Sequence, residues 1–199
     1  MMGNTHVWAG ITAALLAVRP ENPASCVIPV TMGALGGLLP DVDIRRSRHG
    51  KEILIAWLMV LFLAIAGVVL DLYLKTGYLS LLWQRLRGTP VLGAFLVAFM
   101  VLWGRRTPHR TLTHSFFFVG ACAGAMYLIL PPLALPFAAG GLSHLLLDAL
   151  NRKPESLLYP FPGGCCMGLC RADGAVNTLL LVGCLGLDFF LVLRLVFPS

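Results

Sequence analysis

The residues of this sequence best suited to chemistry are its histidines and the aspartates that accompany them. Five histidines occur among 199 residues, and two of them, His109 and His114, lie on either side of Arg110 in the segment Thr107–Ser115. Imidazole is a common metal ligand and exchanges protons near neutral pH. The segment therefore predicts a metal-binding or proton-transferring loop, with a purely structural histidine pair as the alternative.

Two further groups supply carboxylates at spacings that suit a metal. Asp41 and Asp43 stand two residues apart just after Pro40. Two such carboxylates bind one metal, bridge two, or leave one as a general base. His144 and Asp148 stand four residues apart, so on a helix both side chains point to the same side. The alternatives are a solvated acidic loop in the first case and a helix-capping pair in the second.

The composition places these groups in a membrane protein. The sequence is 58% hydrophobic and 12% charged, whereas a soluble domain carries about 25% charged residues. We expect one domain over residues 1–199, an all-α, multi-pass transmembrane bundle of about seven helices, some of them short. In such a protein the net charge of +6 reports topology, so no nucleic-acid partner is expected beside the lipid bilayer.

Apolar runs of the sequence predict these helices. A run of about 20 apolar residues crosses a bilayer, and shorter runs need shielding by their neighbours. Residues 75–90 are expected to form an interfacial connection, and residues 151–174 a loop. The runs are Val7–Val18, Val27–Leu39, Ile53–Leu74, Val91–Trp103, Ser115–Leu130, Ala134–Leu150 and Val176–Val196.

If each run crosses the bilayer once, every second connection lies on the same face. The polar residues that then meet on one face are His6, Asp41, Asp43, His109, His114, His144 and Asp148. Histidine and carboxylate ligands together are typical of zinc or manganese, which lower the pKa of a bound water. One added or missing crossing would scatter these residues, so their convergence depends on the count of seven crossings.

The same face carries most of the basic residues. By the positive-inside rule it is expected to be cytoplasmic. Arginines around a site also hold phosphate groups, which is a competing reason for their position. Ten of the 15 Lys and Arg residues fall on this face: Arg45, Arg46, Arg48, Lys51, Arg105, Arg106, Arg110, Arg152, Lys153 and Arg171.

The order of these motifs resembles the YdjM family of LexA-regulated inner-membrane proteins, which are described as metal-dependent hydrolases. The blocks are also distantly similar to zinc-dependent phospholipase C, an all-helical phosphoesterase. The resemblance covers residues 3–165 and departs from the family in the segment 151–154 and in the cysteine-rich loop 165–170. The matching blocks are Thr5-His6 followed by Gly10, Leu39-Pro40-Asp41-Val42-Asp43, His109-Arg110-Thr111-Leu112-Thr113-His114-Ser115 and Ser143-His144-Leu145-Leu146-Leu147-Asp148.

The resemblance implies a role for each residue of these blocks. Asp43 and His109 are implied as ligands or acid–base partners, and Arg110 as an anion contact. The implied ligands of the divalent metal, zinc or manganese, are His6, Asp41, His114, His144 and Asp148.

We therefore expect a hydrolase of the inner membrane that acts on a phosphoester of a lipid or another anionic amphiphile at the bilayer surface. The alternative is a non-catalytic metal-binding or transport protein, and a third reading is a membrane module with a stabilising metal. Transport predicts polar groups at mid-membrane, where Asp188 is the strongest case.

Overall fold

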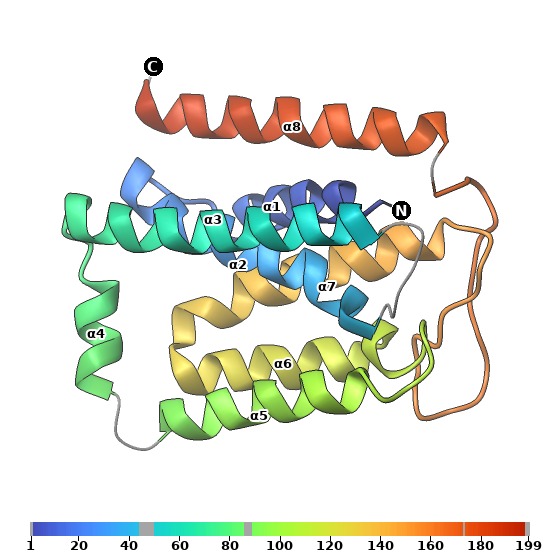
Figure 1. The fold of residues 1–199 in the computed structure, drawn as a ribbon. Coiled ribbons are helices and arrows are strands. Elements are labelled where there is room, and N and C mark those ends of the chain that lie inside the picture. Colours follow the sequence, from blue (N-terminus) through green and yellow to red (C-terminus); the bar gives the residue numbers. More distant parts are fainter. Residues whose placement is uncertain (1, 44–49, 86–88, 173, 198–199) are drawn as a thin grey trace.

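The computed structural model describes residues 2–43, 50–85, 89–172 and 174–197, and these residues form an all-helical fold (Figure 1). No β-strand occurs within these ranges, although two isolated β-bridges hold the loop after α7. The α-helices are α1 (Gly3–Val18), α2 (Val27–Leu38), α3 (Gly50–Leu74), α4 (Tyr78–Arg85), α5 (Thr89–Gly104), α6 (Phe116–Ile129), α7 (Ala134–Ala149) and α8 (Ala175–Val196).

Each predicted apolar run coincides with one of these helices, which confirms the all-α class. The segment expected to be an interfacial connection differs, because it contains the additional helix α4. The carboxylate of Asp71, near the end of α3, accepts from the backbone N–H groups of Tyr78 at 2.9 Å and Leu79 at 3.1 Å. An acidic side chain on the free N–H groups of a first turn stabilises a helix, which explains why this short segment folds.

The inner layer of the fold consists of α1, α2 and α7, which pack against one another along their lengths. Glycines make this packing close. A Cβ atom on Gly37 would collide with the carbonyl oxygen of His6, and one on Gly36 with that of Phe137. Small residues that let helix backbones touch are typical of packing in membranes. The same contacts bring the polar ends of the three helices together.

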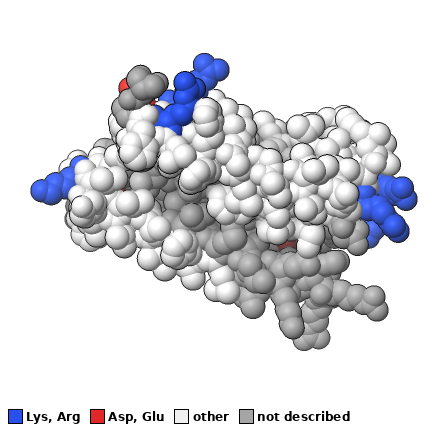
Figure 2. Space-filling model, turned by 90° about the horizontal axis from the view of Figure 1, so that it is seen from above, with Lys and Arg blue, Asp and Glu red and all other residues white. Residues whose placement is uncertain are grey.

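The outer helices expose large apolar side chains. Figure 2 shows the basic side chains at the edges of the face in view, with a broad surface between them that carries few charged side chains. On α5, Phe95 is 70% exposed, and on α8 Leu179 is 72% exposed. Many exposed large apolar side chains together are typical of a surface that contacts a membrane or another protein.

Among the residues that the structure describes, two helical stretches are long and apolar enough to cross a bilayer. They are Pro23–Asp43, which includes α2, and Ala175–Val196, which is α8. The shorter helices α5 and α6 are apolar as well but fall below a full span. The predicted basic run Arg45, Arg46 and Arg48 lies outside the described residues, so the expected charge bias of that connection stays a prediction.

Candidate metal centre

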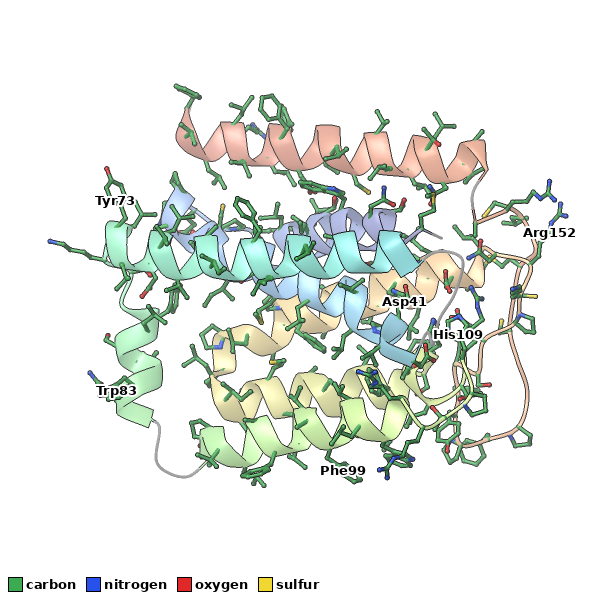
Figure 3. All side chains as sticks on the ribbon, in the orientation of Figure 1. Asp41, Tyr73, Trp83, Phe99, His109 and Arg152 are labelled. Atoms are coloured by element: carbon green, nitrogen blue, oxygen red, sulfur yellow. The ribbon has the colours of Figure 1, made fainter. Side chains whose placement is uncertain are left out.

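The predicted polar residues come from five segments that end on the same side of the bundle. His6 lies in the first turns of α1, and His144 and Asp148 lie in the last turns of α7. Two short 3₁₀ helices, Leu39–Asp43 after α2 and Leu112–His114 before α6, supply Asp41, Asp43 and His114, and the turn that follows α5 supplies His109. Figure 3 shows Asp41 and His109 at this end, far from Tyr73 and Trp83.

Helix ends explain how the segment before α6 reaches the centre. Ser115 caps α6, because its side chain accepts from the backbone N–H of Phe118 at 3.1 Å. Helix α6 therefore begins two residues after His114, and His114 lies in the preceding 3₁₀ turn, where its side chain is fully buried.

The backbone of α2 orients His144. Its Nδ1 lies 2.7 Å from the carbonyl oxygen of Gly37. A carbonyl only accepts, so Nδ1 carries the proton and Nε2 presents its lone pair. His144 is fully buried, and its lone pair therefore points into the protein rather than into solvent.

Thr113 and Asp43 orient His114 in the same way. The Thr113 hydroxyl lies 2.5 Å from Asp43 Oδ2 and 3.0 Å from His114 Nδ1. The single hydroxyl hydrogen goes to the carboxylate, which only accepts, so the hydroxyl oxygen accepts from the Nδ1–H group of His114. His114 is therefore left with a free lone pair on Nε2.

The two Nε2 atoms of His114 and His144 lie 3.3 Å apart. Asp41 Oδ1 lies 3.6 Å from the first and 3.7 Å from the second, and Asp148 Oδ2 lies 3.7 Å from His114 Nε2. Zinc bonds of about 2.0–2.2 Å at tetrahedral angles hold ligand atoms about 3.3–3.6 Å apart. The buried lone pairs and carboxylates thus fit a divalent cation.

His6 adds a second, overlapping group. Its Nε2 lies 3.2 Å from Asp148 Oδ1, and its ring stacks on that of His144 with centroids 3.8 Å apart. The side chain is 1% exposed, and neither ring nitrogen makes a hydrogen bond within the described residues. Buried polar atoms are rarely left unpartnered. A cation shared with His144 and Asp148 would satisfy His6.

His109 lies at the edge of the centre. Its Nδ1 lies 2.8 Å from Asp43 Oδ1, and its side chain is 40% exposed. Because the carboxylate accepts from Nδ1–H, Nε2 of His109 is left as a proton acceptor at the solvent side. His109 therefore connects the buried hydrogen bonds of Asp43 and Thr113 to the solvent.

The comparisons agree with this architecture. The YdjM inner membrane protein family matches residues 1–196 of the chain. The chain belongs to the YdjM family. No curated protein matches it, and no solved structure matches it either. The family description and the long apolar helix α8 support a membrane location for this YdjM chain.

In this YdjM chain Arg110, which was predicted to contact an anion, binds a predicted metal ligand. Its NH2 group donates to Asp148 Oδ2 at 2.5 Å, and its NH1 group donates to the carbonyl of Lys153 at 2.7 Å. The residue has φ +67°, an uncommon value for a side-chain-bearing residue, which turns the loop toward α7. Only its buried Nε lacks a partner. Arg110 thus orients Asp148, and its Nε–H group is left without a partner among the described residues.

Glu155 is a residue of this end that the sequence reasoning missed. It is 1% exposed, and neither carboxylate oxygen has a hydrogen-bond partner within the described residues. Burial, reinforced by the nearby Asp148 carboxylate, raises the pKa of Glu155 to about 8. Glu155 lies in a Pro- and Gly-rich loop without periodicity, so no sequence signal marks it. Its backbone pairs with that of Cys165 in both directions, at 3.0 and 2.9 Å, which fixes its position.

Proposed function

We propose that the chain is a metal-dependent hydrolase of the inner membrane that cleaves a phosphoester of a lipid or another anionic amphiphile. One observation supports this most directly. The Nε2 lone pairs of His114 and His144 face each other at 3.3 Å, and each lies within 3.7 Å of a buried Asp41 oxygen. Two neutral acceptors at this distance repel unless a cation lies between them.

The residues around the cation divide the remaining work. A bound zinc or manganese ion supplies Lewis acidity, which polarises a phosphoryl oxygen and acidifies water. His109 takes up the proton at its Nε2, because Asp43 holds its Nδ1–H at 2.8 Å. The free Nε of Arg110 donates to a phosphate oxygen beside Asp148.

An amphiphilic substrate fits the surface that surrounds this centre. The loop after α7 exposes large apolar side chains, including Leu158 at 68%, Phe161 at 71% and Leu169 at 71%. This loop is joined to the His109–His114 segment, because Ser156 N–H donates to the carbonyl of Arg110 at 2.9 Å. Apolar side chains at the mouth of a charged site suit a ligand with an anionic head and an apolar tail.

Metal content and turnover test the proposal. The purified protein in detergent is loaded with Zn²⁺ or Mn²⁺, its metal is measured by mass spectrometry, and hydrolysis is followed with a generic phosphodiester and with phospholipid micelles. We expect His144→Ala and Asp41→Asn to lose both metal and turnover. The matched control is Asp71→Asn, which changes a buried carboxylate at the end of α3 that lies away from the metal centre. This variant should retain both metal and turnover.

The outcomes separate the readings. If the wild type binds metal but hydrolyses neither substrate, the metal centre is supported and the proposed hydrolase activity is rejected. If the wild type binds no metal, or if His144→Ala still binds it, both the metal centre and the hydrolase activity are rejected.

We propose further that the bundle crosses the membrane several times and that its metal end faces the cytoplasm. The supports are the exposed apolar helices and the basic residues at this end, such as Arg152. Cys165 and Cys166 are exposed at the same end and serve as natural labels. A membrane-impermeant maleimide should label them in inside-out vesicles and not in intact spheroplasts, and the reverse pattern would overturn the orientation.

A further inference from the structure

A groove lies between the C-terminal ends of α1 and α8, away from the metal centre. Its volume of about 480 Å³ is within the range of ligand sites. His6 lies in the first turns of α1, whereas the groove lies at the other end of this helix, 9 to 13 residues further on, which is about 14–20 Å along the helix axis. Its apolar walls include Leu15, Leu16, Leu191 and Leu195, and its only charged lining residues among those described are Arg19 and Arg194.

The two helices that form the groove run parallel and are joined by polar contacts along their length. Thr5 donates to Asn177 Oδ1 at 2.9 Å, and Thr12 donates to Asp188 Oδ1 at 2.7 Å. The next step of seven residues along α1 reaches Arg19. At this position α8 offers no acceptor to α1, because the residue of α8 that lines the groove with Arg19 is another arginine, Arg194.

Neither arginine is neutralised by a carboxylate. No ion pair of Arg19 or Arg194 occurs within the described part of the chain, and both side chains are exposed. Arg194 is held over the ring of Phe190, with its Cζ atom 5.5 Å from the ring centroid. The C-terminal dipoles of two helices contribute about half a negative charge each, which leaves about one positive charge in the groove.

We propose that this groove binds one anionic phospholipid of the membrane. The headgroup phosphate lies between Arg19 and Arg194 and accepts from both guanidinium groups. An acyl chain lies along the leucine walls, of which Leu16 is 49% exposed. The phosphate neutralises the repulsion between the two arginines, and its hydrogen bonds to both of them connect the end of α8 to the end of α1. This site is independent of the proposed hydrolase and lies at the other end of the molecule.

Lipid retention tests the proposal. The full-length chain is released from detergent micelles containing dioleoyl phosphatidylglycerol or dioleoyl phosphatidylcholine, and bound lipid is counted by native mass spectrometry. We expect one phosphatidylglycerol per chain, held at least about tenfold more tightly than phosphatidylcholine, because phosphatidylcholine carries a quaternary ammonium next to its phosphate, which the two arginines repel. The double variant Arg19→Gln/Arg194→Gln should remove this preference.

Three controls keep the outcome decisive. Arg152→Gln/Arg171→Gln removes the same charge from exposed residues at the metal end and should retain the preference. Leu16→Ser should weaken retention of the lipid, and millimolar inorganic phosphate should fail to displace it. Equal retention of both lipids, displacement by inorganic phosphate, or a preference that survives the double variant would overturn the proposal. Circular dichroism shows whether the double variant folds. If it does not fold, the single variant Arg194→Gln replaces it in the lipid-retention test.

Discussion

Two stretches of the chain, around α2 and in α8, both qualify as bilayer-crossing helices by length and composition, yet they lie in opposite surroundings. The apolar window that contains α2 is 61% buried inside the protein, and that of α8 is 6% buried. Their glycines differ in the same way. Gly37 on α2 touches the backbone of α1, whereas Gly186 on α8 has open space where a Cβ would lie. Close backbone contact therefore distinguishes α2, which lies in the inner layer, from α8, which lies outside it.

The largest expected effect comes from adding one methyl group to each kind of glycine. Gly37→Ala forces a Cβ into the carbonyl of His6 and should lower the free energy of unfolding by about 1–3 kcal/mol or more. Gly186→Ala should leave it unchanged or raise it by about 0.5–1 kcal/mol, because alanine loses less backbone entropy in a helix. Unfolding in detergent, followed by circular dichroism, measures both. Equal effects at the two positions would contradict the division into layers.

The second largest expected effect is a loss of stability when the metal is removed from the centre at the end of the inner layer. A metal at 100 times its dissociation constant stabilises the folded state by about 2.7 kcal/mol. We expect EDTA to lower the melting temperature of the wild type and not that of His144→Ala. Asp188→Asn on α8 changes a buried carboxylate of the outer layer and should keep the full response to metal. The division fails if Asp188→Asn abolishes the response.

Two threonines with similar hydrogen bonds should differ in their effect on metal affinity. Thr113→Val breaks the link between Asp43 and His114, and such supporting partners are worth about 10–100-fold in metal affinity. Thr12→Val breaks the bond to Asp188 and should cost about 0.6 kcal/mol of stability without changing metal affinity. Isothermal titration with Zn²⁺ measures the affinity, and comparable losses in both variants would show that α8 contributes to the centre.

The last expected effect is a pH dependence from Glu155, which is small for each pH unit but extends over several units. The unfolded chain releases this proton near pH 4.5, whereas burial holds it in the folded chain up to about pH 8. Between these values the unfolded state binds fewer protons, so stability falls as pH rises, by at most about 1.4 kcal/mol per pH unit. Glu155→Gln should remove this slope in EDTA. Parallel stability curves for wild type and variant from pH 5 to pH 8 would mean that the carboxyl is not held protonated.

The sequence contained most of the fold because its apolar runs are long and are interrupted by clear turn residues. Ile53–Leu74 and Val176–Val196 were predicted within three residues of the bounds of α3 and α8. The helix α4 was missed, because its first turn depends on a cap from Asp71 on another helix. Burial was not evident from the apolar runs alone, because the stretch around α2 and the helix α8 are both apolar enough to cross a bilayer, yet only the first is mostly buried.

The candidate centre was predictable as a set of residues but not as a geometry. The spacing of His144 and Asp148 placed both on one face of a helix, and alternation of the helices brought the other groups to the same end. The tautomers of the two central histidines depend on Gly37 and Thr113, which are apolar or small and carry no signal of their own. The engagement of Arg110 with Asp148 depends on a backbone turn that residue types alone do not specify.

Gly37 has a consequence for the order of events during synthesis. It receives the backbone of α1 on one side and fixes the ring of His144 through its carbonyl on the other, yet His144 is translated more than a hundred residues later. While α1 and α2 emerge from the ribosome, the proposed centre has only part of its ligand residues. In the proposed centre, loading with metal therefore has to wait until α7 has been synthesised and packed against α2, and a shorter nascent chain should not retain the ion.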